Sequence, residues 1–305
     1  MRIVIAGGSG YIGRHLTRRL REGGARVVWL SHRPGRASGA GAYGPDLEVA
    51  FDPHERDASW AEELAGADAV VNLSGHPISS RWNPTVKHLL RESRVETGRA
   101  LVTALAALDS AHRPPVYVSA SGVGYYGDRA DDILGETEPP GEDWLSRLAV
   151  DWEAEALRAA EHEVRPVVVR TGLVLGDVGL VPRMKLPFQL FAGGPVGTGR
   201  QYVSWTHIDD IARVYEHAIA CEELSGPVNA SGEPLRMREF ASALGRVLGR
   251  PSWFPVPMFA LKLVMGEVAP YLVMSQRADT AKLLSSGFTP RFMTAEDALR
   301  DVLGR

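Results

Sequence analysis

Residues 2–13 read RIVIAGGSGYIG and join an apolar run, Arg2–Ala6, to a glycine-rich loop, Gly7–Gly13. An apolar run bounded by glycines predicts a buried strand, and Tyr11–Glu22 carries the apolar periodicity of a helix. The loop contains the spacing G-x-G-x-x-G, which permits a tight turn and a close approach of the backbone to a pyrophosphate. The free N–H groups and the dipole of the following helix favour the same anion. The stretch therefore predicts the opening strand, turn and helix of a dinucleotide-binding fold; a glycine-rich turn without a ligand is the alternative.

Short apolar runs alternate with longer helical stretches through the first two thirds of the sequence. This alternation predicts a parallel sheet whose strands are joined by crossover helices. The expected strands are Arg2–Ala6, Arg26–Leu30, Glu48–Phe51, Ala69–Leu73, Val116–Ser119, Val164–Arg170 and Pro227–Ala230. The expected helices are Tyr11–Glu22, Ser59–Ala65, Thr85–Leu108, Trp144–Ala160 and Ile208–Glu222. The expected fold class is α/β, a Rossmann-like doubly wound parallel sheet with a smaller, mostly helical C-terminal substrate domain.

The sequence changes character after Arg170, because glycines and prolines interrupt the pattern until about residue 204. We expect residues 1–175 to form a Rossmann-type NADP-binding domain, to which the chain returns around residues 205–230. Residues 231–305 are expected to form the smaller domain, with 176–204 as loops of the cleft. Within that domain, the apolar stretch Phe254–Met274 contains prolines and charges, so it predicts an amphipathic helix that packs rather than a membrane span.

Composition excludes several classes of protein. The 305 residues are 45% hydrophobic and 23% charged, as in an ordinary globular protein. Lys and Arg number 34 against 37 Asp and Glu, for a net charge of −3, which argues against nucleic acid or a membrane as partner. One cysteine, Cys221, and no secretory leader after Met1 predict a cytoplasmic protein. No Cys or His spacing matches a metal site, so no metal is expected, and a homodimer is an open possibility.

The end of the second expected strand indicates which nicotinamide cofactor the loop prefers. An NAD-binding fold places Asp or Glu there to hold the ribose 2′-hydroxyl. This chain instead has Ser31-His32-Arg33, with Arg36 three residues later. Arginine pairs with a phosphate in bidentate fashion, so Ser31 and Arg33 predict NADP(H). A solvated loop arginine is the alternative for Arg33.

Further cofactor contacts are expected at the carboxyl ends of later strands, where open α/β sheets bind ligands. Asp52 follows the third strand and has two interpretations: an acceptor for the adenine amino group, or a turn or N-cap residue. Asn72–Gly75 ends the fourth strand. The expected cofactor-binding residues are Gly7, Gly10, Tyr11, Ile12, Gly13, Ser31, Arg33, Asp52, Leu73, Ser74, Gly75 and Ser119.

Three motifs resemble those of a known superfamily. Gly7–Gly13 has the form G-G-x-G-x-x-G, Val118–Gly127 resembles a V-S-S…Y-G stretch, and His207–Asp210 resembles an H-[VI]-D-D element. With these motifs the chain resembles the extended short-chain dehydrogenase/reductases. It is more narrowly similar to their atypical group, labelled nucleoside-diphosphate-sugar epimerase-like, which has an extra C-terminal domain of unknown function. The supporting segments are Val71–Gly75, Arg81-Trp82, Ser93–Val95, Gly122–Gly127, Asp151–Glu153, Gly193–Gly199, Trp205–Ile208 and Gly287-Phe288. The resemblance implies a Rossmann-like fold, bound NADP(H) and a small-molecule substrate in an interdomain cleft.

One departure from this superfamily concerns catalysis. Its ordinary members use Tyr-x-x-x-Lys, in which the lysine lowers the pKa of the tyrosine so that the phenol exchanges a proton with substrate. With Glu153 as the register mark, Leu145 stands where the tyrosine belongs and Ala149 where the lysine belongs. No tyrosine of this chain is followed by a lysine four residues later. The usual mechanism is therefore not implied by the resemblance.

Three hydroxyl side chains are the catalytic candidates in place of that pair. Ser121 matches the superfamily's catalytic serine and would hold a substrate carbonyl, or else it is a strand-end serine bonded to nucleotide or backbone. Tyr125 and Tyr126 follow the same strand, and either would supply a phenol, with aromatic packing as the alternative. We expect an NADP(H)-binding, epimerase- or oxidoreductase-like enzyme of unassigned substrate. A non-catalytic NADP(H)-binding regulatory or sensor protein is the alternative.

Overall fold

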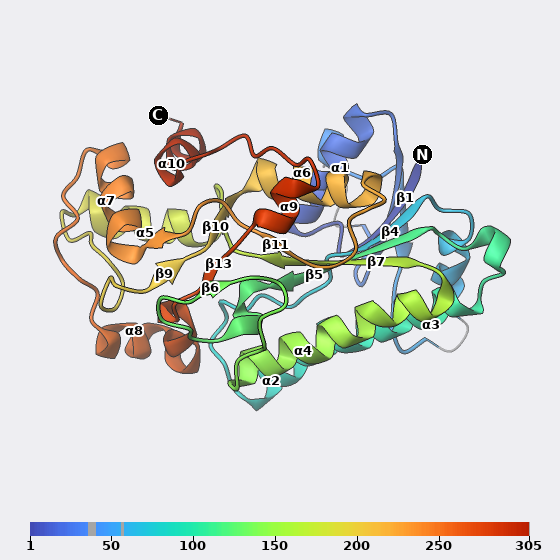
Figure 1. Ribbon diagram of the computed structural model, residues 1–305, viewed down its shortest axis with the longest axis horizontal. Helices are drawn as coiled ribbons and strands as arrows, with labels where there is room; N and C mark the ends of the chain where they lie inside the picture. The colour runs from blue at the N-terminus through green and yellow to red at the C-terminus, as the bar shows by residue number, and fades with distance from the viewer. Residues whose placement is uncertain (36–40, 56–57, 305) are drawn as a thin grey trace.

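The computed structural model describes residues 1–35, 41–55 and 58–304, and its centre is a parallel sheet of seven strands (Figure 1). The strands lie in the order β11-β7-β5-β4-β1-β2-β3. Their bounds are β1 Arg2–Ala6, β2 Arg26–Ser31, β3 Leu47–Ala50, β4 Ala69–Asn72, β5 Val116–Gly122, β7 Arg165–Thr171 and β11 Gly226–Ala230. All seven expected strands are present, and the Rossmann-like doubly wound fold is confirmed.

Helices and short strands connect and extend this sheet. The α-helices are α1 Tyr11–Glu22, α2 Pro84–Arg91, α3 Thr97–Ala107, α4 Trp144–Leu157, α5 Leu180–Gln189, α6 Ile208–Ala220, α7 Met237–Leu248, α8 Met258–Met265, α9 Ala281–Ser285 and α10 Ala295–Leu303. The 3-10 segments are Gly41–Tyr43, Ser59–Leu64, Ser110–His112, Val123–Tyr126, Arg158–His162 and Gly266–Val273. The short strands are β6 Ile133–Leu134, β8 Leu173–Leu175, β9 Tyr202–Val203, β10 Trp205–His207, β12 Leu235–Arg236 and β13 Arg277–Ala278.

Alternate side chains of the sheet enter two hydrophobic cores. Ile3 and Ile5 of β1 join the core that α1 and α6 cover. Val4, one residue out of phase, joins the core on the opposite face, to which α3 contributes Leu101 and Leu105. Successive side chains of a strand point to opposite faces, so a strand covered on both sides is apolar throughout. Figure 1 shows α1 and α6 above the sheet and α3 and α4 below it.

Two expected helices differ from the structure in geometry. The helix expected over Thr85–Leu108 is present, but a π-helical turn at Glu92–Glu96 separates α2 from α3. Such turns are rare in proteins, and those that occur are often found at functional sites. The helix expected over Ser59–Ala65 is a 3-10 helix that buries Trp60. Hydrophobic spacing locates both segments, but it does not distinguish these helix types.

A third hydrophobic core lies outside the sheet, at the left of Figure 1. It is formed by α5, α7 and α10 with Trp205 of β10. The connections return to the sheet region more than once. β10 pairs in parallel with β8 and leads directly into α6, and β13 pairs with β6 through Arg277 and Ile133.

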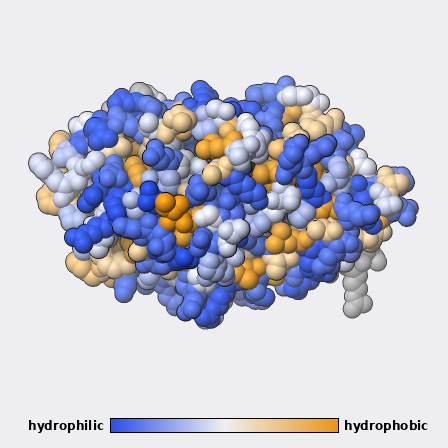
Figure 2. Space-filling view, viewed as in Figure 1, coloured by the Kyte–Doolittle hydropathy of each residue, from blue (hydrophilic) through white to orange (hydrophobic). Residues whose placement is uncertain are grey.

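The apolar stretch Phe254–Met274 does not form the packed amphipathic helix that its sequence predicts. α8 buries none of its residues, and the side chains of Phe259 and Leu263 are 75% and 78% exposed. α8 ends at Met265, and the 3-10 segment Gly266–Val273 that follows contains Pro270 and buries Val268 and Ala269. The space-filling view shows apolar side chains in small patches among hydrophilic ones (Figure 2). Among helices in the described ranges, none has the length and apolar content that crossing a bilayer requires.

Candidate cofactor and substrate site

The glycine-rich loop is shaped by contacts that leave no room for side chains. Gly7 has a positive φ of 77°, and a Cβ there would lie 2.7 Å from the carbonyl carbon of Leu73 and the nitrogen of Ser74. A Cβ on Gly8 would collide with the indole of Trp29 in β2. The loop therefore lies directly against the ends of β2 and β4, and these glycines are required by packing before any ligand binds.

The first turn of α1 presents backbone N–H groups without a cap. Gly10 is the N-cap, so no side chain bonds to the helix end, and the first turn contains no acidic residue. The first N–H groups of a helix have no partner within it, and the dipole places partial positive charge there. In this turn they belong to Tyr11, Ile12 and Gly13. The arrangement suits the pyrophosphate of a dinucleotide.

A buried hydroxyl lies at the end of β2. Ser31 is only 4% exposed, and its Oγ makes no hydrogen bond with a described residue. Buried hydroxyls are normally paired, so a bound ligand is a natural source of the missing partner. Arg33, two residues later, is exposed, and its guanidinium contacts no other described residue through a hydrogen bond or ion pair. Arg36 lies outside the described residues.

Asp52 has a role within its own turn. Its Oδ1 accepts the His54 N–H at 2.9 Å, and its carbonyl oxygen accepts the indole N–H of Trp60 at 3.2 Å. The carboxylate therefore stabilises a local turn, as one of the two interpretations of this residue expects.

The ends of β4 and β5 are held by side chains within the sheet. Asn72 is fully buried, and its Oδ1 accepts the Ser74 N–H at 3.1 Å. The Leu73 N–H donates to the Ala6 carbonyl at 2.8 Å, which continues the pairing of β4 with β1. Ser119, in register with Asn72 on β5, is fully buried, and its Oγ donates to the neighbouring carbonyl of Ala120 at 3.2 Å. Leu73 and Ser74 thus border the glycine loop, the exposed Gly75 follows them, and Ser119 lies beside Asn72 on the neighbouring strand.

The hydroxyl of Ser121 is engaged in a buried ion pair. Arg170 donates from Nε and Nη2 to the two carboxylate oxygens of Glu153, at 2.9 and 2.8 Å. Ser121 Oγ donates to the same carboxylate at 2.6 Å. Burial opposes the charge of Arg170, but Glu153 outweighs it and raises the pKa of the guanidinium. All three side chains are buried, so the structure places Ser121 in this network rather than on an open surface.

The two candidate tyrosines have different surroundings. The Tyr126 hydroxyl is buried, accepts from Arg170 Nη1 at 2.9 Å and donates to Asn229 Oδ1 at 2.8 Å. The ring of Tyr125 lies against the same cation, with Arg170 Cζ 3.5 Å from the ring centroid. The Tyr125 hydroxyl makes no hydrogen bond with a described residue. Of the three candidate hydroxyl groups, that of Tyr125 is therefore the one that remains available to a ligand.

Apolar packing surrounds Leu145, the residue that the sequence register predicts at the position of the usual tyrosine. Leu145 is in the first turn of α4, and a Cβ on Gly124 would lie 3.0 Å from its Cδ2. It packs in a cluster with Trp82, from the loop before α2, and Tyr271, from the C-terminal segment. Ala149, one turn along α4, is buried. The C-terminal segment therefore covers the part of α4 that contains Leu145.

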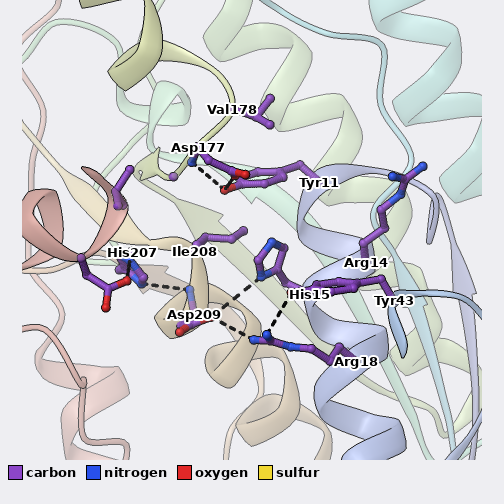
Figure 3. Close-up of a pocket in the computed structure, with 13 residues that line it drawn as sticks. Tyr11, Arg14, His15, Arg18, Tyr43, Asp177, Val178, His207, Ile208 and Asp209 are labelled. Atoms are coloured by element: carbon purple, nitrogen blue, oxygen red, sulfur yellow. Dashed lines mark hydrogen bonds and ion pairs between the residues drawn. The ribbon is translucent and has the colours of Figure 1, made fainter. Parts of the chain in front are cut away.

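A pocket of about 490 Å³ opens beside α1 (Figure 3). The Tyr11 side chain forms one wall, and its hydroxyl donates to Asp177 Oδ1 at 2.6 Å and accepts the Asp177 N–H at 3.1 Å. A Cβ on Gly176 would collide with that hydroxyl. Burial, followed by the hydrogen bond to Asp177, raises the pKa of Tyr11. Tyr11 thereby joins the first turn of α1 to the loop that follows β8.

The His207–Asp210 motif has a structural role at the start of α6. His207 Nδ1 accepts the Asp209 N–H at 3.1 Å, and Asp210 accepts the backbone N–H groups of Arg291 and Phe292 at 2.8 and 3.0 Å. Burial lowers the pKa of His207. The motif thus links α6 to the C-terminal segment. In the part of the chain that the structure describes, no group of three or more His, Cys, Asp or Glu side chains is arranged to hold a metal ion.

Two residues of this region were missed by sequence reasoning. Asp177 has no local signal, because its partner Tyr11 is 166 residues away. Arg94 is buried and donates to the carbonyl oxygens of Leu90 and His76 at 3.2 and 3.1 Å. Arg94 could have been found from its place on the apolar face of an expected helix. A charged residue at such a place needs hydrogen-bond acceptors inside the protein.

Comparison with known proteins places the chain among characterised families. The model of the NAD dependent epimerase/dehydratase family matches residues 3–229, and that of a domain of unknown function, DUF1731, matches residues 256–302. The chain is 36% identical over 305 residues to the chloroplastic epimerase family protein SDR39U1 homolog of Arabidopsis thaliana, covering 99% of this chain and 87% of that protein. Similar solved structures include human epimerase family protein SDR39U1 with NADPH, with a TM-score of 0.87, 32% identity and 100% coverage of both chains. A nucleoside-diphosphate sugar epimerase from Corynebacterium glutamicum has a TM-score of 0.79 and 30% identity, covering 100% of this chain and 58% of that one.

The epimerase model extends from β1 to the last strand of the sheet, and DUF1731 covers α8 to α10. Similarity to the Arabidopsis and human proteins spans the whole chain, including the glycine loop, the sheet and the C-terminal segment. The chain therefore belongs to the NAD-dependent epimerase/dehydratase family, in the group of epimerase family proteins that also carry DUF1731.

Proposed function

We propose that the chain binds NADP(H) and is an oxidoreductase or epimerase-like enzyme with an atypical active site, acting on a small molecule. The observation that carries the proposal is the glycine loop, where side chains do not fit at Gly7 and Gly8 and the first turn of α1 is uncapped. A human relative at 32% identity was crystallised with NADPH, which supports the same cofactor here.

The residues present fit three parts of this cofactor: the pyrophosphate, the ribose and the 2′-phosphate. The N–H groups of the first turn of α1 would hold the pyrophosphate, and the segment Leu73–Gly75 would border the ribose. The unpartnered Ser31 hydroxyl and the unpaired Arg33 guanidinium would hold the 2′-phosphate. When bound, NADP(H) supplies or accepts a hydride, while the protein orients the substrate and polarises the reacting oxygen.

We place the substrate between the ends of the strands and the C-terminal segment. Residues 231–305, with the loops of 176–204, would form the far wall of this cleft. The third hydrophobic core and the pairing of β13 with β6 support the assignment, because they hold that segment against the sheet-bearing part. Tyr125 is the hydroxyl candidate available to a substrate, since Ser121 and Tyr126 are engaged with Glu153 and Arg170.

The direct test is a calorimetric titration of the whole chain with NADPH and with NADH. We expect saturable binding of both, with NADPH tighter by about tenfold or more, as one charge-assisted phosphate contact would give. Tighter binding of NADH, or no saturation by either, would contradict the proposal. Equal affinities would leave Arg33 as a solvated loop residue and remove the preference for NADP(H).

A second candidate, a non-catalytic NADP(H)-binding regulatory or sensor protein, is favoured by the packing of Leu145 and Ala149. Neither side chain can exchange a proton, and both lie where the superfamily has its acid/base pair. Such a protein would bind NADPH without oxidising it in the presence of simple carbonyls or sugar nucleotides. Sustained NADPH oxidation with any of these substrates would exclude the sensor interpretation.

A further inference from the structure

Two adjacent side chains of the π-helical turn Glu92–Glu96 hold the backbone of His76. Ser93 Oγ accepts the His76 N–H at 2.8 Å, and Arg94 Nη2 donates to the His76 carbonyl oxygen at 3.1 Å. Both backbone groups of one loop residue are thus fixed by a helix that follows it by 17 and 18 positions. A π-turn presents side chains at angles that a regular helix does not, which explains how neighbours in sequence reach both groups.

The Arg94 contact is made at an energetic cost. Arg94 is 6% exposed, and no carboxylate among the described residues pairs with its guanidinium. Burial lowers its pKa to about 10, so it stays charged at neutral pH. The Trp152 ring, 5.1 Å from Arg94 Cζ, offers a partial compensation. A buried cation without an anion is normally avoided, so a fixed position for His76 is a reason to retain it.

His76 lies beside the expected cofactor position. It follows the carboxyl end of β4, the strand next to β1, and Gly7 of the cofactor loop packs on the Leu73–Ser74 backbone just before it. Gly75 gives Arg94 access, because a Cβ there would be 3.1 Å from Nη2. The imidazole is partly exposed and makes no hydrogen bond, ion pair or ring contact with a described residue. The backbone is therefore fixed while the side chain remains free to react.

We propose that His76 is the catalytic proton-transfer residue of this site, and that Ser93 and Arg94 position it. The inference rests on the proposed NADP(H)-dependent function. An imidazole changes protonation near neutral pH, as a group that replaces the phenol must. In reduction, a carbonyl carbon gains a hydride from NADPH while the imidazolium of His76 gives its proton to the carbonyl oxygen. The products are the alcohol, NADP⁺ and neutral imidazole, and the reverse direction returns the proton to His76.

The test uses the charge difference between the two cofactor states, so it needs no substrate. The nicotinamide ring is positive in NADP⁺ and neutral in NADPH, whereas the Arg94 charge is the same in both complexes. We record histidine NMR spectra of the full chain at pH 6.5, saturated with either cofactor, with His76→Gln to assign the signal. The ratio of imidazolium to imidazole at His76 is expected to be about tenfold lower with NADP⁺, as for a like charge within about 4–6 Å. His112, in the 3-10 segment that precedes β5, is the internal control and should not change.

An unchanged ratio at His76 in protein saturated by both cofactors overturns this inference and leaves cofactor binding intact. Failure of either cofactor to saturate overturns the proposed function instead. Positioning is tested with Arg94→Met, which removes the buried charge, and with Ser93→Ala, which removes the acceptor of the His76 N–H. Each should shrink the difference at His76 between the two complexes, while Arg26→Met, at an exposed arginine at the start of β2, should not. A full-sized difference in both folded variants overturns the positioning role.

Discussion

The ends of β1 and β5 lie in one sheet, two positions apart, but they are built from different kinds of interaction. At β1 the site consists of backbone: glycines that fit where no side chain can, and the uncapped start of α1. At β5 it consists of side chains whose partners come from elsewhere, 32 residues away for Ser121 and 103 for Tyr126. The function of a motif that binds through backbone groups can be predicted from the motif itself. The role of a side-chain hydroxyl depends on which residues it contacts in the fold.

The largest effect expected from this difference is on stability at the β5 end. Glu153→Ala leaves the Arg170 guanidinium buried without its bidentate partner and removes the acceptor of Ser121. The free energy of unfolding should fall by about 3–5 kcal/mol, measured by urea denaturation. Glu216→Ala is the control, because it breaks a partly exposed pair with Arg19 at 2.7 Å, worth less than about 1 kcal/mol. Similar losses for the two variants would contradict a structural role for the β5 network.

At the β1 end, the expected effect is on binding and not on folding. Gly10→Val adds a branched side chain to the N-cap of α1, where a Cβ would already lie 3.2 Å from the Gly7 carbonyl oxygen. It should weaken NADPH binding by about a hundredfold or more by blocking approach to the helix N-terminus. Gly23→Val, at the other end of α1, should bind NADPH as the wild type does. Undiminished affinity in folded Gly10→Val protein would show that the pyrophosphate is not held there.

A smaller effect should separate the two cofactors. Arg33→Ala removes an exposed guanidinium, so stability should not change, but NADPH should bind about tenfold to hundredfold less tightly. NADH lacks the 2′-phosphate, and its affinity should be unaltered. Arg26→Ala, at the start of β2, the strand that precedes Arg33, is the matched control for loss of one positive charge. Equal weakening of NADPH and NADH would assign Arg33 a role other than phosphate selection.

The contrast between the two ends also explains how much the sequence predicts. Strands, α1 and the glycine loop are predictable because apolar runs and glycine spacing act over a few residues. Asp52 has two sequence interpretations, and the structure shows the local one, a bond to the His54 N–H two residues away. The engagement of Ser121 by Glu153 and Arg170 is not predictable, since no local pattern specifies a partner on another element. The exposure of α8 is missed for the same reason, because apolar composition alone does not say what covers a helix.

The smallest expected effect distinguishes two neighbouring tyrosines. Tyr126→Phe removes the acceptor of Arg170 Nη1 and the donor to Asn229, both buried, and should cost about 1–3 kcal/mol of stability. Tyr125→Phe keeps the ring that lies on Arg170 and removes a hydroxyl that bonds to no described residue, so its cost should be within about 0.5 kcal/mol. Urea denaturation of the two variants side by side measures the difference. If Tyr125→Phe destabilises as much as Tyr126→Phe, the Tyr125 hydroxyl has a structural partner and is not free for a substrate. A near-neutral effect of Tyr125→Phe would mean that the Tyr125 hydroxyl resembles the N–H groups at the β1 end: the fold orders both, and neither is paired with another described residue.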